Sequence, residues 1–81
     1  MFDGVVAITG ASAGIGAALA ERLGRRGVRV ALIARRADAL REVVARCDGH
    51  GMAVVADMTR RADAERAVAE TLAAFGGIDA W

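Results

Sequence analysis

The residues best suited to chemistry in this sequence are three glycines in the stretch TGASAGIG, residues 9–16. Gly10, Gly14 and Gly16 follow an apolar run of strand length and precede an amphipathic pattern of helical period. Backbone N–H groups at a helix start bind phosphate, and glycine lets the backbone approach the ligand without an intervening Cβ. Ser12 adds a hydroxyl that could donate to phosphate or cap the turn. The stretch indicates a pyrophosphate-binding turn, with a plain strand-to-helix turn as the alternative.

The elements that must position this turn are three apolar segments of strand length, Val5 to Thr9, Val28 to Ala34 and Met52 to Ala56. Between these segments and after the last one lie stretches with an apolar stripe of helical period, which we expect to face a sheet. Thr59 is a candidate N-cap for the third helix. The stripes are Ile15, Ala18, Leu19 and Leu23; Leu40, Val43, Val44 and Cys47; and Ala67, Val68, Thr71, Leu72 and Phe75.

This order predicts an α/β fold, a partial Rossmann fold in which three parallel strands alternate with three helices. The final residues GGIDAW, 76–81, have the character of a turn into a fourth strand. In a doubly wound sheet the first strand lies between the second and the fourth. We therefore expect one side of the first strand to be unpaired if the chain stops at Trp81.

The spacing T-G-x-x-x-G-x-G resembles the cofactor turn of the short-chain dehydrogenase/reductase family. The stretch ADMT, residues 56–59, resembles the end of the family's third strand, and FGGIDAW, residues 75–81, resembles the approach to its fourth. The resemblance covers all 81 residues and implies the N-terminal part of one NAD(P)-binding Rossmann domain. It implies that Asp57 contacts the adenine amino group and that Met58 flanks the ring. The cofactor turn would comprise Thr9, Gly10, Ser12, Ala13, Gly14, Ile15 and Gly16.

The end of the second apolar segment carries residues that could distinguish NADP from NAD. An acidic residue there would bind the two ribose hydroxyls of NAD, but this chain has Ala34, followed by Arg35 and Arg36. A guanidinium pairs well with a 2′-phosphate, so these residues favour NADP. The alternative is a solvated arginine loop. Ala13 stands where some NADP-using relatives have a basic residue, which would leave the selectivity partial.

The proton relay that the resemblance implies has no counterpart in this chain. The family uses a Tyr and a Lys in the pattern Y-x-x-x-K, with Ser and Asn, whereas this sequence has no Tyr and all 11 of its basic residues are Arg. We interpret His50 as an exposed turn residue and Cys47 as a small buried hydrophobe. The sequence therefore assigns no catalytic residue and no metal ligand, and whether the chain is an enzyme stays open.

Composition excludes other classes of protein. A net charge of +1, from 11 basic and 10 acidic residues, favours neither a nucleic-acid nor a membrane partner. The single Cys47 cannot form an intrachain disulfide and suits a reducing compartment. The start MFDGVVAITG lacks the pattern of a signal peptide. We expect a cytoplasmic protein.

The leading hypothesis is the NADP(H)-binding N-terminal part of an oxidoreductase. The resemblance implies a parent that transfers hydride between the nicotinamide and a small carbonyl or alcohol substrate, and that assembles as a homo-oligomer. Two alternatives remain. One is a stand-alone half-Rossmann module that binds a nucleotide or pairs with another chain, and the other is an inactive remnant.

Overall fold

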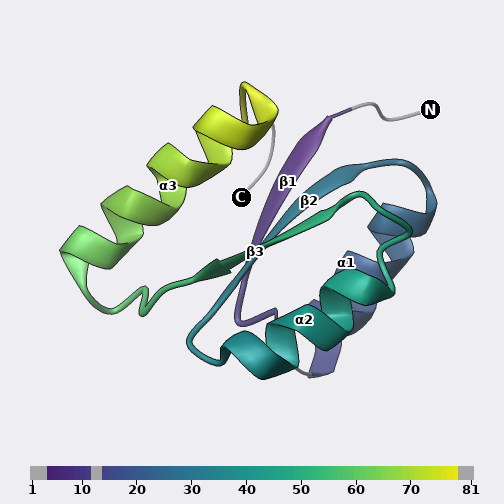
Figure 1. The fold of residues 1–81 in the computed structure, drawn as a ribbon, viewed down its shortest axis with the longest axis horizontal. Coiled ribbons are helices and arrows are strands. Elements are labelled where there is room, and N and C mark those ends of the chain that lie inside the picture. The colour runs from purple at the N-terminus through teal and green to yellow at the C-terminus, as the bar shows by residue number, and fades with distance from the viewer. Residues whose placement is uncertain (1–3, 12–13, 79–81) are drawn as a thin grey trace.

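The computed structural model describes residues 4–11 and 14–78 and forms a parallel sheet with helices on both faces (Figure 1). The predicted order of strands and helices is confirmed. The strands are β1 (Val5–Thr9), β2 (Arg29–Ala34) and β3 (Gly51–Val55), and the helices are α1 (Gly14–Arg25), α2 (Ala37–Ala45) and α3 (Arg61–Phe75). Of the helices in the described part of the chain, none has the length and apolar character needed to cross a membrane.

The sheet has the order β1-β2-β3, and both strand pairs are parallel. In this register Thr9 pairs with Ile33, and Ala34 pairs with Val55. The carboxyl ends of all three strands therefore meet at one edge of the sheet, where loops can combine residues that are far apart in sequence. Strand β1 lies at the side of β2 away from β3, as the doubly wound order predicts.

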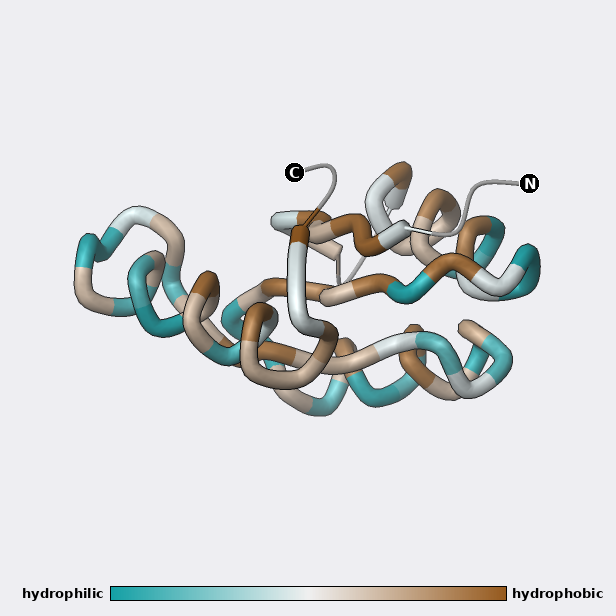
Figure 2. The backbone as a smooth tube through the Cα atoms, turned by 90° about the horizontal axis from the view of Figure 1, so that it is seen from above, coloured by the Kyte–Doolittle hydropathy of each residue, from teal (hydrophilic) through white to brown (hydrophobic). Residues whose placement is uncertain are grey.

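Two hydrophobic clusters cover the two faces of β2. Val30 and Leu32 belong to the cluster beneath α1 and α2, whereas Ala31 and Ile33 belong to the cluster beneath α3. All four side chains are fully buried. Burial on both faces explains why this strand shows no polar alternation in sequence. Figure 2 shows hydrophobic stretches along the strands, and helices in which hydrophobic and hydrophilic residues alternate.

The sequence prediction for the buried face of α1 is correct for Leu23, which packs against the cluster beneath α1 and α2, and wrong for Ile15, Ala18 and Leu19. Ile15 and Leu19 are exposed, at 88% and 45%, and the buried residues of this helix are Ala20 and Gly24. Near its C-terminal end the helix lies very close to the turn after α2, where a Cβ at Gly24 would lie 2.6 Å from the carbonyl oxygen of Cys47. At that point only glycine fits.

Helix α3 also buries small residues in place of some of the larger ones predicted for its inner face. Val68 and Leu72 are partly exposed, at 37% and 45%, whereas Ala67 and Thr71 are fully buried. The Thr71 hydroxyl donates to the Ala67 carbonyl at 2.8 Å, which satisfies its polar atom inside the core. The sequence predicts the helix correctly but places too many large side chains on its buried side.

Cys47 and His50 lie in the connection between α2 and β3. Cys47 is fully buried, as predicted, and burial together with the negative charge of Glu21 raises the pKa of its thiol. A protonated, inaccessible thiol is a poor nucleophile. The sequence predicts an exposed His50, but this residue is half-buried. Its backbone is tied to the fold, because its N–H donates to the Cys47 carbonyl at 3.1 Å and its carbonyl accepts from the Val30 N–H at 2.9 Å.

The predicted N-cap of the third helix is also wrong. Helix α3 begins at Arg61, and Arg60 is its N-cap residue, without a side-chain cap hydrogen bond. The Thr59 hydroxyl instead donates to Asp57 Oδ1 at 2.6 Å. The Thr59 hydroxyl thus binds the carboxylate of the preceding turn, and the helix begins one residue too late for Thr59 to be its N-cap.

Candidate functional site

A cleft with a volume of about 330 Å³ lies where the three strands end. Ligands of doubly wound folds bind in this position, outside the carboxyl ends of the strands. Six of the residues predicted to form a site line it: Thr9, Gly10, Arg35, Arg36, Asp57 and Met58. Ile33, Ala34, Ala56 and Thr59 complete the lining.

The turn from β1 into α1 forms one end of the site. Gly10 and Gly14 have φ values of +64° and +61°, in the left-handed region that side chains rarely adopt. A Cβ at Gly16 would lie 2.9 Å from the Gly10 carbonyl oxygen and 3.3 Å from the Ala11 Cα. Helix α1 therefore packs so closely against the end of β1 that a side chain at position 16 would not fit. The predicted site residues Ser12 and Ala13 lie outside the described residues.

The start of α1 beside this turn is open. Gly14 and Ile15 are both exposed, and they form the first turn of the helix together with Gly16. The first N–H groups of a helix have no partner within the helix and carry partial positive charge. The turn therefore offers backbone donors to an anion, although Gly14, Ile15 and Gly16 lie outside the lining of the cleft itself.

Two arginines follow β2 and line the middle of the cleft. Arg35 and Arg36 are exposed, and within residues 4–11 and 14–78 neither side chain forms an ion pair. Other arginines of this chain differ in this respect: Arg25 contacts Glu21 at 2.9 Å and Arg61 contacts Glu65 at 3.3 Å. The guanidinium groups at the cleft are thus available to an anionic ligand.

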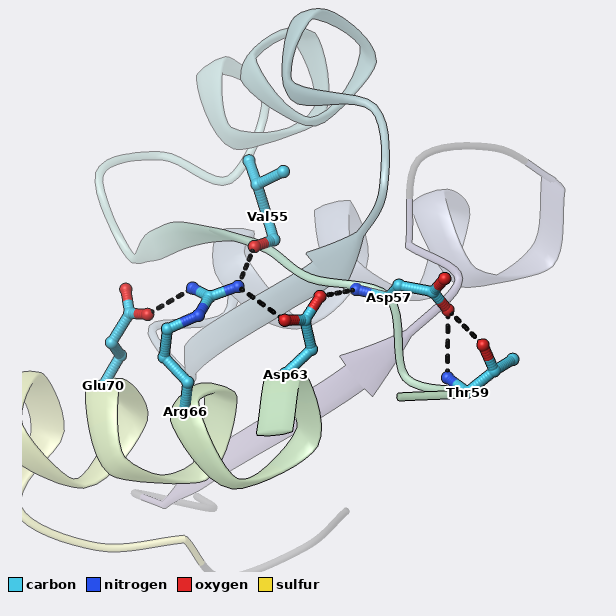
Figure 3. Close-up of polar contacts among 6 residues, drawn as sticks. All are labelled: Val55, Asp57, Thr59, Asp63, Arg66 and Glu70. Carbon is cyan, nitrogen blue, oxygen red and sulfur yellow. Dashed lines mark hydrogen bonds and ion pairs between the residues drawn. The ribbon is translucent and has the colours of Figure 1, made fainter. Parts of the chain in front are cut away.

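The other end of the site contains Asp57, which follows β3. Its Oδ1 accepts hydrogen bonds from the Thr59 hydroxyl at 2.6 Å and the Thr59 amide at 3.0 Å (Figure 3). These two bonds lower the pKa of the Asp57 carboxyl and outweigh the opposing effect of desolvation, and the charges of Arg35 and Arg60 lower the pKa slightly further. The carboxylate is therefore ionised at neutral pH and can accept a hydrogen bond from a ligand.

Sequence reasoning misses three residues at this end of the site. It interprets Thr59 as a helix cap, and it assigns no site role to Asp63 or Arg66. The contact of Thr59 could have been predicted from the sequence, because an Asp side chain often accepts a hydrogen bond from the backbone two residues later, as in the pattern Asp-x-Thr. Met58, the predicted ring neighbour, lines the cleft and also packs against the hydrophobic cluster beneath α3.

Comparison with known proteins identifies the family. A family model described as short chain dehydrogenase matches residues 4–81. The chain belongs to the short-chain dehydrogenase family. The resemblance inferred from the glycine turn is confirmed, and so is the partial Rossmann fold. Members of this family are oxidoreductases that bind NAD(P).

Curated relatives in the short-chain dehydrogenase family are several times longer than this chain. A hydroxysteroid 11-beta-dehydrogenase 1-like protein of Xenopus tropicalis is 46% identical over 78 residues, which are 91% of this chain and 27% of the relative. An A-factor type gamma-butyrolactone 1′-reductase of Streptomyces virginiae is 44% identical over 81 residues, covering 96% of this chain and 32% of the relative. The chain thus spans about a third or less of each.

Solved structures of short-chain dehydrogenases share the fold closely. Glucose dehydrogenase of Caenorhabditis elegans, in its apo form, superposes with a TM-score of 0.88 at 34% identity, covering 94% of this chain and 35% of that chain. A metagenomic short-chain oxidoreductase in complex with NADP has a TM-score of 0.88 at 35% identity, covering 95% of this chain and 36% of that chain. The match places the three strands and three helices of this chain within the larger fold of the family.

Proposed function

We propose that this chain is the NADP(H)-binding part of a short-chain dehydrogenase. The observation that supports NADP over NAD is the end of β2, where Ala34 replaces an acidic residue and Arg35 lines the cleft without a carboxylate partner among the described residues. A carboxylate at position 34 would repel a 2′-phosphate, whereas a guanidinium attracts it. Solved relatives of similar identity hold NADP in one case and NADH in another, so the proposal of NADP rests on the residues at the end of β2.

The glycine turn and the residues of the adjoining cleft fit the parts of a dinucleotide in order. The amides at the start of α1 would hold the pyrophosphate, where the absence of a Cβ at Gly10 and Gly14 keeps the backbone accessible. Arg35 would pair with the 2′-phosphate, and Asp57 would accept a hydrogen bond from the adenine amino group. The cofactor, when bound, supplies or accepts hydride.

The proposal extends to the whole protein of which such a site would be part. That whole protein would interconvert a small carbonyl compound and its alcohol, using a proton relay that the sequence of this chain does not contain. We further propose a cytoplasmic location, supported by the single buried Cys47, and a homo-oligomeric assembly, supported by the family resemblance.

The experiment that tests this proposal is a calorimetric titration of the chain with NADPH and with NADH. We expect NADPH to bind more tightly by about tenfold to a hundredfold, the usual contribution of a charge-assisted hydrogen bond. The double variant Ala34→Asp/Arg35→Ser should bind NADH as well as or better than NADPH, because the acid accepts from the ribose hydroxyls and repels the phosphate.

Arg61→Ser provides the matched control. Arg61 lies on α3 outside the cleft and pairs with Glu65, so its loss removes the same charge without touching the site. The ratio of the two affinities should be unchanged in this variant. An unchanged ratio in the Ala34→Asp/Arg35→Ser variant would contradict the assignment of NADP.

A further inference from the structure

The outer side of β3 carries two backbone groups whose hydrogen-bond partners are side chains of α3. The Val55 carbonyl accepts from Arg66 Nη2 at 2.6 Å, and the Asp57 N–H donates to Asp63 Oδ2 at 2.8 Å (Figure 3). The residue between them has the opposite orientation, because the Ala56 N–H donates to the Ala34 carbonyl of β2 at 2.9 Å. The carbonyl of residue 55 and the amide of residue 57 are thus the pair that a further parallel strand would bind.

Helix α3 satisfies this pair in place of a strand. Arg66 also contacts Glu70 at 2.6 Å and Asp63 at 3.9 Å, so one guanidinium joins the strand carbonyl to two carboxylates. An exposed strand edge readily pairs with another chain, and side chains that occupy its polar groups prevent this. The contacts also fix where the chain leaves the sheet, directly before the residues of the cleft.

This arrangement differs from an ordinary row of surface ion pairs. The Arg61–Glu65 pair on the same helix is highly exposed, at 92% and 69% for the two side chains, and Arg61 donates to no backbone group in the described residues. Pairs of that kind contribute little to stability. Asp63 and Arg66 are less exposed, at 33% and 45%, and both bond the backbone of a different element.

The consequence concerns Asp57, whose backbone and side chain are held from opposite directions. Asp63 accepts from its amide, and Thr59 donates twice to a single carboxylate oxygen, Oδ1. The second carboxylate oxygen accepts no hydrogen bond from the described residues. We propose that Asp63, supported by Arg66, is a positioning residue that orients Asp57 toward the adenine amino group. This inference rests on the proposed function, because it concerns the same cofactor site.

The test compares Asp63→Ala, Asp63→Asn and a control in the same chain, with two measurements. Amide hydrogen exchange at Asp57 reports the contact itself, and we expect Asp63→Ala to accelerate it by at least about tenfold, as a local opening. NADPH titration reports the function, and we expect affinity to fall by about three- to tenfold on loss of one charge-assisted bond. The ratio of NADPH to NADH affinity should not change, because Arg35 follows β2 and not β3.

Asp63→Asn keeps an oxygen acceptor at the same position, so its NADPH affinity should stay within about twofold of the unchanged chain. Glu65→Ala removes one acid from the same helix outside this network and should alter neither measurement. If Asp63→Ala does not fold, Arg66→Met replaces it. That variant removes the bond to Val55 and the cation beside Asp63. We expect it to accelerate amide exchange at Asp57 and to weaken NADPH binding, each by about two- to threefold.

The outcomes separate the two proposals. If the unchanged chain binds NADPH and a folded Asp63→Ala or Arg66→Met variant binds it equally well, the positioning role is overturned while the proposed function stands. Unaltered exchange at Asp57 in these variants overturns it as well. If the unchanged chain shows no saturable NADPH binding, the proposed function fails first and the positioning role fails with it.

Discussion

The two ends of the cleft are built by different means. At the β1–α1 turn, glycines determine the geometry through backbone conformation and the absence of Cβ atoms, as at Gly10 and Gly16. After β3, side-chain hydrogen bonds determine it, with Asp57 held by Thr59 and Asp63. The first end should therefore be sensitive to added volume and insensitive to pH. The second should tolerate volume but respond to pH and to the loss of single atoms.

The largest expected effect follows from adding volume to the glycine turn. In Gly16→Val the Cβ would lie 2.9 Å from the Gly10 carbonyl oxygen, which is backbone and cannot move aside as a side chain can. We expect the free energy of unfolding to fall by about 1–3 kcal/mol, as in other overpacked sites. If Gly16→Val still folds, its NADPH binding should be undetectable, because the turn that would hold the pyrophosphate is displaced. Thermal unfolding followed by circular dichroism and calorimetric titration measure the two effects.

Gly77→Val is the matched control for this substitution. A Cβ at Gly77 would have no atom within 4 Å, so the same change in side chain meets open space. Its NADPH affinity should equal that of the unchanged chain. Equal losses in the two variants would show that valine acts by a general effect on the fold and not through the approach of α1 to β1.

A smaller effect is expected at the polar end, in Thr59→Val. The side chain keeps its shape but loses the hydroxyl that donates to Asp57, so the pKa of the Asp57 carboxyl should rise toward its usual range. Nuclear magnetic resonance titration of the carboxyl carbon measures this shift. NADPH affinity at neutral pH should fall by no more than about threefold, because the Thr59 amide still donates.

The pH dependence of stability follows from the sign of this shift. A lowered pKa in the folded state stabilises the fold above the pKa of the unfolded chain, and the stabilisation is lost as the pH falls through the folded value. Thr59→Val should therefore reduce stability at neutral pH, and the difference from the unchanged chain should shrink in acid. An Asp57 pKa that is identical in the two proteins would contradict the role given to the hydroxyl.

The same contrast explains how much of the site could be predicted from the sequence. A position that needs a positive φ or no Cβ is usually occupied by glycine. The spacing of Gly10, Gly14 and Gly16 therefore predicts the turn without any knowledge of the packing. Strand order and cofactor turn follow from the same local patterns. The contacts of Asp63 and Arg66 with β3 depend on where α3 packs, and no local pattern reports this.

The errors in the prediction have related causes. The residue type of Thr59 suits a helix cap, but the helix begins at Arg61 and the Thr59 hydroxyl donates to Asp57 in the preceding turn. Ile15 and Leu19 are large and apolar, which predicts a place in the core, but α1 buries Ala20 and Gly24 instead, and Gly24 lies too close to Cys47 for a side chain. In both cases residue type alone does not report where the helix begins or which side of it packs.

The most direct test of the central claim is a titration of the isotope-labelled chain with NADPH, followed by the backbone amide signals. If one dinucleotide spans the cleft and the adjoining glycine turn, signals of Gly10 and Gly16 in the turn, of Arg35 in the middle of the cleft and of Asp57 at its other end should shift together with a single dissociation constant. Gly51, at the opposite end of β3, should stay unchanged. Shifts confined to one end of the cleft, or different constants at the two ends, would contradict a single dinucleotide site.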